Sequence, residues 1–255
     1  MLFLMQMAGS VVLLAALTAT APESRSADFS VSPMIVEFPR GVRSAEIQVR
    51  NLDTQPIRFQ VRGADWSQDE NGKNTYSDST TLIWFPRALE LAPGESRIIR
   101  VGVRATPAAR EQAYIIFLQE VALESAQTEK RAGAQVKLLL SISIPVFIPP
   151  VKPRTDTAFD SIALRNGVLD VNIRNAGNRH FSYREALVVG LGPDGSQKFA
   201  QKLGGRTLLA GSRQRLEVKV PREICRQLQE LALTLITSEQ SELKRRLDVS
   251  RADCE

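Results

Sequence analysis

The sequence has few of the residues from which catalytic and metal sites are built. Its 255 residues include a single histidine, His180, and two cysteines, Cys225 and Cys254, both near the C-terminal end. One histidine leaves little for a Ser-His-Asp triad, and no spacing of cysteine and histidine fits a zinc site. The glycine-containing stretches "GPDG" and "LGG" are typical of hairpin turns rather than of phosphate loops. The composition therefore indicates a protein that is not an enzyme and uses no cofactor or metal.

Charge and aromatic residues are also too dispersed to mark a nucleic-acid surface. The net charge is +5, which makes an anionic partner worth considering. The densest basic cluster, however, is only Lys244, Arg245 and Arg246. Aromatic residues make up 6% of the chain, and Trp66 and Trp84 lie in separate segments, so we expect them in a core. No nucleic-acid partner is predicted.

The first residues resemble an export signal. Residues 1–21 carry no charge and hold a Leu/Val/Ala run followed by small residues, which predicts a signal peptide over residues 1–27, cleaved near Ser26 or Ala27. An uncleaved membrane anchor is the alternative, because the segment is long enough to span a bilayer. In an exported chain Cys225 and Cys254 can form one disulfide; two unpaired thiols are the other interpretation.

Short apolar stretches separated by turn signals fill the first half of the chain. Apolar and polar residues alternate over 45–49 and 57–61, on either side of the turn "NLDTQP", which predicts two antiparallel strands. The stretches "TLIWFP", "IIRVGV", "AYIIFLQEVAL" and "VKLLLSISIPVFI" continue the pattern. About seven strands with no long helical period predict a β-sandwich.

A proline-rich stretch divides the chain into two domains. "PPVKPRTD", residues 149–156, is predicted to connect a domain over 28–150 to another over 155–255. The second half repeats the short-strand pattern with Gly, Asn and Asp at the turns, so we expect a second β-sandwich. Its one helix is predicted at 221–231, with Pro221 at the first position.

Several of these stretches resemble one known family in their order and spacing. They are "FSVSPMIVEF", "AEIQVRNLDTQPIRFQVRGADW", "LELAPGESRIIRVGVR", "AYIIFLQEV", "VKLLLSISIPVFIPP" and "LDVNIRNAGNRHF", which together cover most of residues 28–180. The family is the periplasmic pilus or fimbrial assembly chaperones of the chaperone-usher pathway, particularly its archaic or spore-coat-like branch.

The resemblance implies an all-β fold of two immunoglobulin-like β-sandwich domains in a boomerang arrangement. It also implies a periplasmic chaperone that binds pilus, fimbrial or spore-coat-like secreted subunits by donor-strand complementation and delivers them to an outer-membrane usher. Neither a nucleotide nor a nucleic acid is implied. An alternative of another class is a secreted two-sandwich module for adhesion or glycan binding.

The apolar strand starting at residue 136 is the expected donor. Side chains alternate along a strand, and alignment on Phe147 selects the register of Val136, Leu138, Leu140 and Ile142 for donation. Four such side chains could contribute roughly 6–12 kcal/mol on burial, before ordering costs. An empty edge of this kind also predicts a weak homodimer. Burial of the strand on both faces of its own sandwich is the alternative.

One departure from the family concerns the subunit's terminal carboxylate. Well-studied members bind it with an Arg on the first strand and a Lys near the end of the donor strand, but Ile35 and Pro145 occupy those positions here. A carboxylate in a partly dry cleft still requires a cation, and we take Arg97, Arg100 and Arg179 as candidates. The family's Arg before the second domain is replaced by Pro149.

Overall fold

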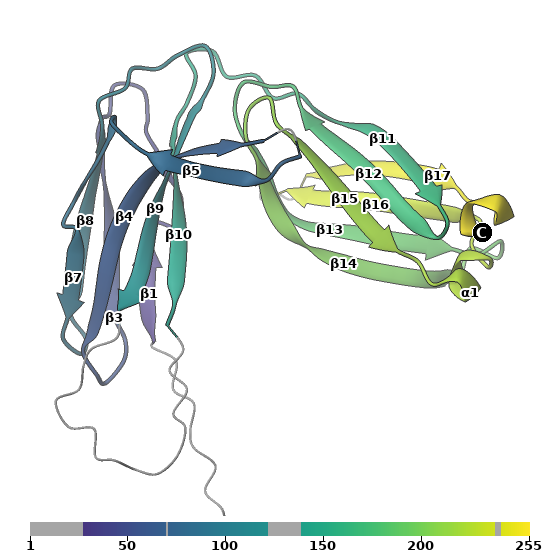
Figure 1. The fold of residues 1–255 in the computed structure, drawn as a ribbon, viewed down its shortest axis with the longest axis horizontal. Helices are drawn as coiled ribbons and strands as arrows, with labels where there is room; N and C mark the ends of the chain where they lie inside the picture. The colour runs from purple at the N-terminus through teal and green to yellow at the C-terminus, as the bar shows by residue number, and fades with distance from the viewer. Residues whose placement is uncertain (1–27, 70, 122–138, 238–240) are drawn as a thin grey trace, which may run out of the picture.

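Two β-sandwiches, set at an angle to each other, make up the part of the chain that the structure describes (Figure 1). The computed structural model describes residues 28–69, 71–121, 139–237 and 241–255. Within these residues almost all regular structure is β-strand, so the predicted fold class is confirmed. The predicted signal peptide, residues 1–27, lies outside the described residues. No helix in the described ranges is both long and apolar enough to cross a membrane.

The first sandwich pairs a four-stranded sheet with a larger one. The four-stranded sheet has the order β1-β3-β8-β6 and consists of β1 (Phe29–Ser32), β3 (Ser44–Asn51), β8 (Ser96–Val103) and β6 (Leu82–Phe85). The second sheet has the order β2-β10-β9-β4-β5, with β7 also paired to β4. Its strands are β2 (Val36–Glu37), β10 (Ser141–Ile148), β9 (Gln112–Val121), β4 (Ile57–Gln68), β5 (Asn74–Asp78) and β7 (Ala88–Leu91).

Alternation of apolar residues builds the core between these sheets. Ile47 and Val49 on β3 and Phe59 and Val61 on β4 are buried, whereas the residues between them are exposed. The buried indole of Trp84 donates a hydrogen bond to the Val61 carbonyl at 3.1 Å. The period of two in the sequence therefore does mark the inward face of each strand.

The second sandwich is built from a three-stranded and a four-stranded sheet with a separate core. The first sheet contains β11 (Thr157–Arg165), β12 (Val168–Asn175) and β15 (Arg213–Lys219). The other contains β14 (Gln197–Leu208), β13 (Phe181–Leu191), β16 (Glu230–Thr237) and β17 (Glu242–Asp248). Leu169, Val171 and Ile173 of β12 and Val188 of β13 are among its fully buried residues.

The helix predicted at 221–231 is much shorter in the structure. Helix α1 covers only Arg222–Cys225, and Glu230 already belongs to β16. The helix ends because Leu228 is buried in the second core and the Gln229 N–H donates to the Leu191 carbonyl at 2.8 Å, beside β13. Cys225 forms a disulfide with Cys254, which ends the 3-10 helix η1 (Arg251–Cys254), with the two Cα atoms 5.7 Å apart.

Candidate functional site

One side of β10 is paired along the whole strand, and the other side only near its end. β9 pairs antiparallel with β10 from Ser141 to Ile148. On the opposite side β2 pairs only with Val146 and Phe147, in parallel. Within the described part of the chain, the outer edge of β10 is therefore unpaired from Ser141 to Pro145. An unpaired edge is a template for an added strand.

The backbone groups at this edge point outward. The Leu140 carbonyl accepts a hydrogen bond from the Glu120 N–H at 2.8 Å, so even-numbered residues of β10 turn their backbone groups toward β9. Ser141 and Ser143 then turn theirs away from β9. Phe147 agrees with this pattern, because its carbonyl accepts from the Phe38 N–H of the β2 side at 3.0 Å. Pro145 lacks an N–H at a position where that group would face outward, so the ladder with β9 stays intact.

The even-numbered side chains of β10 face the core of the first sandwich. Ile144, Val146 and Ile148 are buried in that core, and Ile142 packs against it while partly exposed. Leu140, half-buried, extends the same face toward the preceding residues. Val136 and Leu138 of the predicted donor register lie outside the described residues.

The odd-numbered side chains test the alternative in which both faces of this strand are buried. Ser141 and Ser143 are exposed, and Leu139 is 51% exposed. Burial on both faces of the domain's own sandwich is therefore wrong for this part of the strand. The even-numbered side chains instead extend the apolar face of the core along the part of β10 whose outer edge is unpaired.

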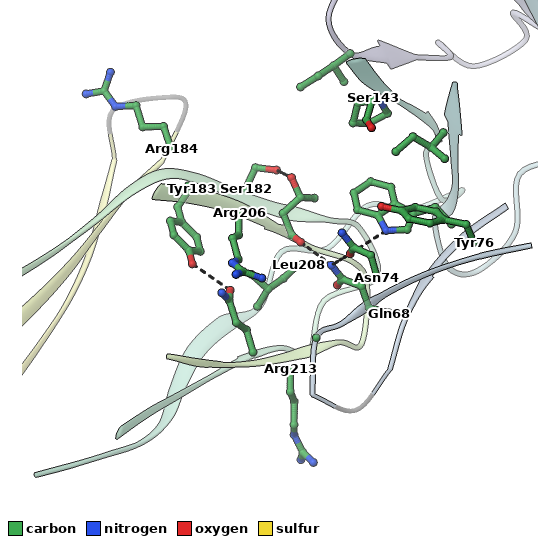
Figure 2. Close-up of a pocket in the computed structure, with 18 residues that line it drawn as sticks. Gln68, Asn74, Tyr76, Ser143, Ser182, Tyr183, Arg184, Arg206, Leu208 and Arg213 are labelled. Atoms are coloured by element: carbon green, nitrogen blue, oxygen red, sulfur yellow. Dashed lines mark hydrogen bonds between the residues drawn. The ribbon is translucent and has the colours of Figure 1, made fainter. Parts of the chain in front are cut away.

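A cleft of about 720 Å³ lies next to this edge, between the two domains (Figure 2). Ser143 and Pro145 of β10 line it together with Ile35, which comes just before β2. Positions 35 and 145 thus do lie at the cleft. These are the positions at which the resemblance places the family's cations. They carry apolar side chains, so the first-domain wall offers no positive charge there.

The opposite wall of the cleft is cationic. The described lining residues include Arg184, Arg206 and Arg213 and no Asp or Glu. Arg213 pairs with Asp160 at 3.5 Å, whereas Arg206 makes no ion pair with any described residue. Figure 2 shows Arg206 beside Tyr183, with Arg184 and Arg213 directed away.

Next to Arg206 lies a buried polar pair with an unused donor. The Tyr183 hydroxyl donates to Gln214 Oε1 at 3.1 Å, and both side chains are buried. Burial raises the pKa of the Tyr183 phenol, so it keeps its proton at neutral pH. Gln214 Nε2 has no hydrogen-bond partner among the described residues. On this wall the Arg206 charge and the Gln214 amide therefore have no matching acceptor among the described residues.

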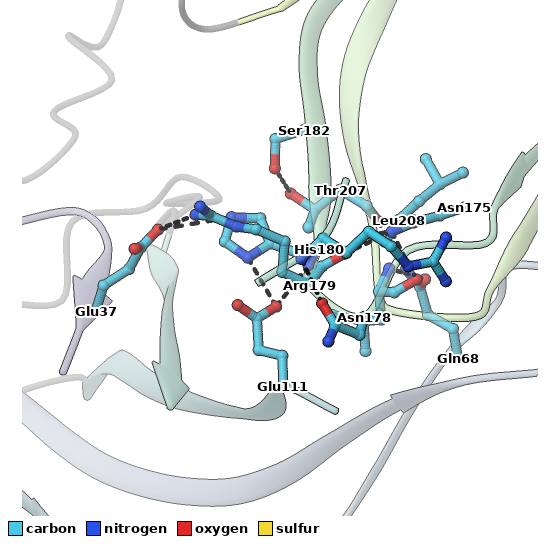
Figure 3. Close-up of polar contacts among 12 residues, drawn as sticks. Glu37, Gln68, Glu111, Asn175, Asn178, Arg179, His180, Ser182, Thr207 and Leu208 are labelled. Carbon is cyan, nitrogen blue, oxygen red and sulfur yellow. Dashed lines mark hydrogen bonds and ion pairs between the residues drawn. The ribbon is translucent and has the colours of Figure 1, made fainter. Parts of the chain in front are cut away.

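A second polar cluster joins the two domains (Figure 3). Glu111 of the first domain lies just before β9, and its carboxylate accepts from the His180 backbone N–H at 2.6 Å and contacts the imidazole Nδ1 at 2.8 Å. The ring stacks on Phe147 with centroids 4.0 Å apart. Its Nε2 lies 3.7 Å from Glu37, which also contacts Arg179 at 3.5 Å. The His180 ring thus lies between two carboxylates of the first domain and has a structural role at the junction. The sequence offered this histidine no catalytic partners, which agrees with that role.

Amide groups and an apolar cluster add to this junction. Gln68 donates to the Thr207 carbonyl and accepts from the Leu209 N–H, both at 2.8 Å. Asn178 donates to the Ala109 carbonyl at 2.9 Å. Leu209 of the second domain is buried in a small cluster on the outer face of the β10-β9-β4 sheet, with Ala64, Trp66, Ile115, Phe117 and Phe147.

The three arginines predicted to anchor a carboxylate are not brought together. Arg97 and Arg100 lie on β8, in the sheet that does not face the second domain, and pair with Glu95 and Glu46 at 2.7 and 3.4 Å. Only Arg179 lies at the junction, where Glu37 already neutralises part of its charge.

Arg206, Gln214 and Glu111 were missed by sequence reasoning. Arg206 and Gln214 come from β14 and β15, which belong to different sheets, and neither shows a local motif. The only usable signal was the resemblance itself. It placed uncharged residues at 35 and 145, which implies that any cation in the cleft must come from elsewhere.

Comparison with known families identifies the first domain. Residues 28–153 match the family model described as "Pili and flagellar-assembly chaperone, PapD N-terminal domain". The family recognised in the sequence is thus confirmed, and its PapD-like members are folding and assembly chaperones rather than enzymes. No curated protein sequence matches the chain.

Solved structures of low sequence identity share the fold. One is the CsuC-CsuE chaperone–tip adhesion subunit pre-assembly complex of Acinetobacter baumannii, with a TM-score of 0.51 and 17% identity over 75% of this chain and 91% of that one. The CupB2 chaperone of Pseudomonas aeruginosa has a TM-score of 0.52 and 13% identity over 86% and 100% of the two chains. The SafA pilin–SafB chaperone complex of Salmonella enterica has a TM-score of 0.55 and 13% identity over 89% and 99%.

Proposed function

We propose, on the premise that residues 28–153 form a PapD-type N-terminal domain of the pili and flagellar-assembly chaperones, that this protein is a periplasmic chaperone for pilus or fimbrial subunits. It binds a subunit by lending it β10 and the residues before it, and then passes the subunit to an outer-membrane usher. Spore-coat-like secreted subunits belong to the same class of partner. Two of the similar structures are complexes of a chaperone with a pilin or tip subunit, which supports this class.

The unpaired edge of β10 is the observation that carries the proposal. Ser141 and Ser143 direct free backbone groups outward, while Leu140 and Ile142 continue the apolar face of the domain's own core. A subunit whose sandwich lacks a strand exposes a groove of core residues and aggregates. Pairing with β10 satisfies its backbone, and the predicted donor side chains Val136, Leu138, Leu140 and Ile142 fill its groove.

Release needs no nucleotide in this scheme. The strand of another subunit that packs better in the same groove displaces the chaperone strand. The free-energy difference between the two packings then drives assembly.

The experiment is co-expression with each small, secreted, β-rich protein encoded beside this chain. We expect the double variant Leu138→Asp/Leu140→Asp to recover at least tenfold less soluble complex from the periplasm than the wild type, because two carboxylates would enter an apolar groove. Pull-down of the tagged subunit measures the yield.

Leu139→Asp is the matched control. It places the same charge on the same strand, but on the exposed face, so we expect wild-type yield. The unfolding midpoints of all variants check that they fold. Equal complex formation by the folded double variant and the wild type would refute donation by this register.

A further inference from the structure

A second cavity, of about 550 Å³, lies on the first domain beside the connector. It shares no described lining residue with the interdomain cleft. Three segments build it: residues 38–43 between β2 and β3, residues 103–107 at the end of β8, and residues 148–153, which lead from β10 to the second domain. A cavity of this size can hold a small molecule.

The cavity is apolar both where it is buried and where it meets solvent. Phe38, Val103 and Ile148 are buried in the first core. Val42 and Val151 also line the cavity, yet they are 45% and 53% exposed. The site therefore leaves in water apolar surface that no described part of the chain covers.

Prolines make the walls poor in hydrogen-bond donors, because a proline has no backbone N–H. The N–H groups of Phe38, Val42 and Val151 are already bonded to backbone carbonyls of the same domain. A ligand that depends on many hydrogen bonds would find few partners here. The prolines that line the cavity are Pro39, Pro107, Pro149, Pro150 and Pro153.

Two arginines, Arg40 and Arg43, are the only polar side chains among the described lining residues. The ion pairs of the described chain involve neither of them. The turn that carries Arg40 is well defined, because the Val42 N–H donates to the Pro39 carbonyl at 2.9 Å and Gly41 has a φ of 84°. Uncompensated positive charge thus lies beside an apolar cavity.

We propose that this cavity binds a small apolar carboxylic acid, with its hydrocarbon body against the prolines and valines and its carboxylate on Arg40 and Arg43. A guanidinium matches the two oxygens of a carboxylate, and apolar walls match a body that needs no hydrogen bonds. The inference does not depend on the proposed function, because it uses neither the free edge of β10 nor the interdomain cleft.

A bound acid would connect two segments that otherwise meet only through the backbone and the core. Val42 belongs to the turn between β2 and β3, and Val151 belongs to the connector. Their N–H groups donate to the carbonyls of Pro39 and Ala108. Both amides should therefore exchange more slowly with solvent when the cavity is filled.

The test uses three probes with one aromatic body: 4-phenylbutyrate, the neutral 4-phenylbutanol and the cationic 4-phenylbutylamine. Each is titrated into the full mature chain, and amide shifts in NMR spectra give both the Kd and the place of binding. The variants are Arg40→Ala/Arg43→Ala, Arg40→Lys/Arg43→Lys and Val151→Asp. Arg104→Ala is the matched control, because this exposed arginine lies between two lining residues but does not line the cavity itself.

We expect phenylbutyrate to bind the wild type about tenfold more tightly than phenylbutanol, and phenylbutylamine not to bind. Arg40→Ala/Arg43→Ala should abolish the tenfold preference, Arg40→Lys/Arg43→Lys should keep part of it, and Arg104→Ala should keep all of it. Val151→Asp should weaken phenylbutyrate, because it places a like charge in the apolar wall. The largest shifts should fall on Val42 and Val151.

Several results would overturn the proposal. Equal binding of phenylbutyrate and phenylbutanol by the wild type would refute the role of the arginines. Shift changes centred on another surface, or no binding of any probe, would refute the site. Binding of vesicles that contain phosphatidylglycerol, without binding of phenylbutyrate, would replace the small acid by a lipid surface as the partner of these arginines.

Discussion

Asn51 and Asn175 occupy matching places in the two sandwiches. Asn51 ends β3, and its Nδ2 donates to the carbonyls of Gln55 and Leu91 at 2.8 and 3.1 Å. Asn175 ends β12, and its Nδ2 donates to the carbonyls of Arg179 and Leu208 at 2.8 and 3.1 Å. Each buried amide therefore ties a strand end to the turn that follows it. In the second domain that turn carries His180 into the junction.

Replacing Asn175 by leucine should lower the free energy of unfolding of the second domain by about 2–3 kcal/mol, because the carbonyls of the following turn and of β14 lose their donor and the Gly177 N–H loses its acceptor. Urea denaturation followed by circular dichroism measures the change. Asn172→Ala is the control, since its side chain makes only an exposed bond to Ser161 and should cost less than about 0.5 kcal/mol. Equal midpoints for Asn175→Leu and the wild type would contradict the assigned role.

Single residues show where sequence reasoning succeeds and where it fails. Asn175 ends an alternating stretch and comes two residues before Gly177, so its place at the end of a strand was predictable. The partner of His180 was not, because Glu111 is 69 residues away and meets it only when the domains dock. Arg206 looks like any exposed strand arginine in the sequence, and only the fold places it opposite Tyr183, which bonds Gln214.

At the scale of an element, β10 combines a core strand with an open edge. Its even-numbered side chains belong to the first core, while its odd-numbered backbone groups before the β2 pairing have no partner among the described residues. The alternation of side chains along the strand predicted which of its two faces is apolar. The stop imposed by β2 could not be predicted, because it depends on the chain crossing between two sheets after β1.

The free edge of β10 should let two copies of the chain associate weakly when no subunit is bound. We expect sedimentation velocity to show a concentration-dependent dimer. Ser143→Pro should abolish the dimer, because it removes an outward N–H without breaking a bond to β9. Ser143→Ala keeps that N–H and should behave as the wild type. A dimer that persists in Ser143→Pro would place self-association on another surface.

Helix α1 shows how packing overrides local pattern. The stretch 221–231 begins with proline and contains good helix formers, yet only Arg222–Cys225 are helical. The Cys225–Cys254 disulfide holds the last residue of this short helix, and the burial of Leu228 in the second core holds the residues that follow it. Such contacts come from residues distant in sequence and have no local signal.

At the scale of the whole molecule, the junction determines how the edge and the cationic wall face each other. The bend between the sandwiches in Figure 1 is held by His180 on Glu111 and Phe147 and by Gln68 on β14. The sequence predicted two domains and a connector. It did not show that side chains from both domains hold the two sandwiches together in addition to the connector.

His180→Ala should therefore loosen the junction between the two domains. Loss of the imidazole removes its contact to Glu111 and its stacking on Phe147, and leaves only the backbone N–H of residue 180 donating to Glu111. The angle between the sandwiches should then vary more widely, and small-angle scattering should show a broader distribution of shapes. Arg215→Ala breaks an exposed ion pair with Asp170 inside the second domain and should leave that distribution unchanged. A wild-type distribution for His180→Ala would mean that the remaining contacts, such as those of Gln68, are enough to hold the bend.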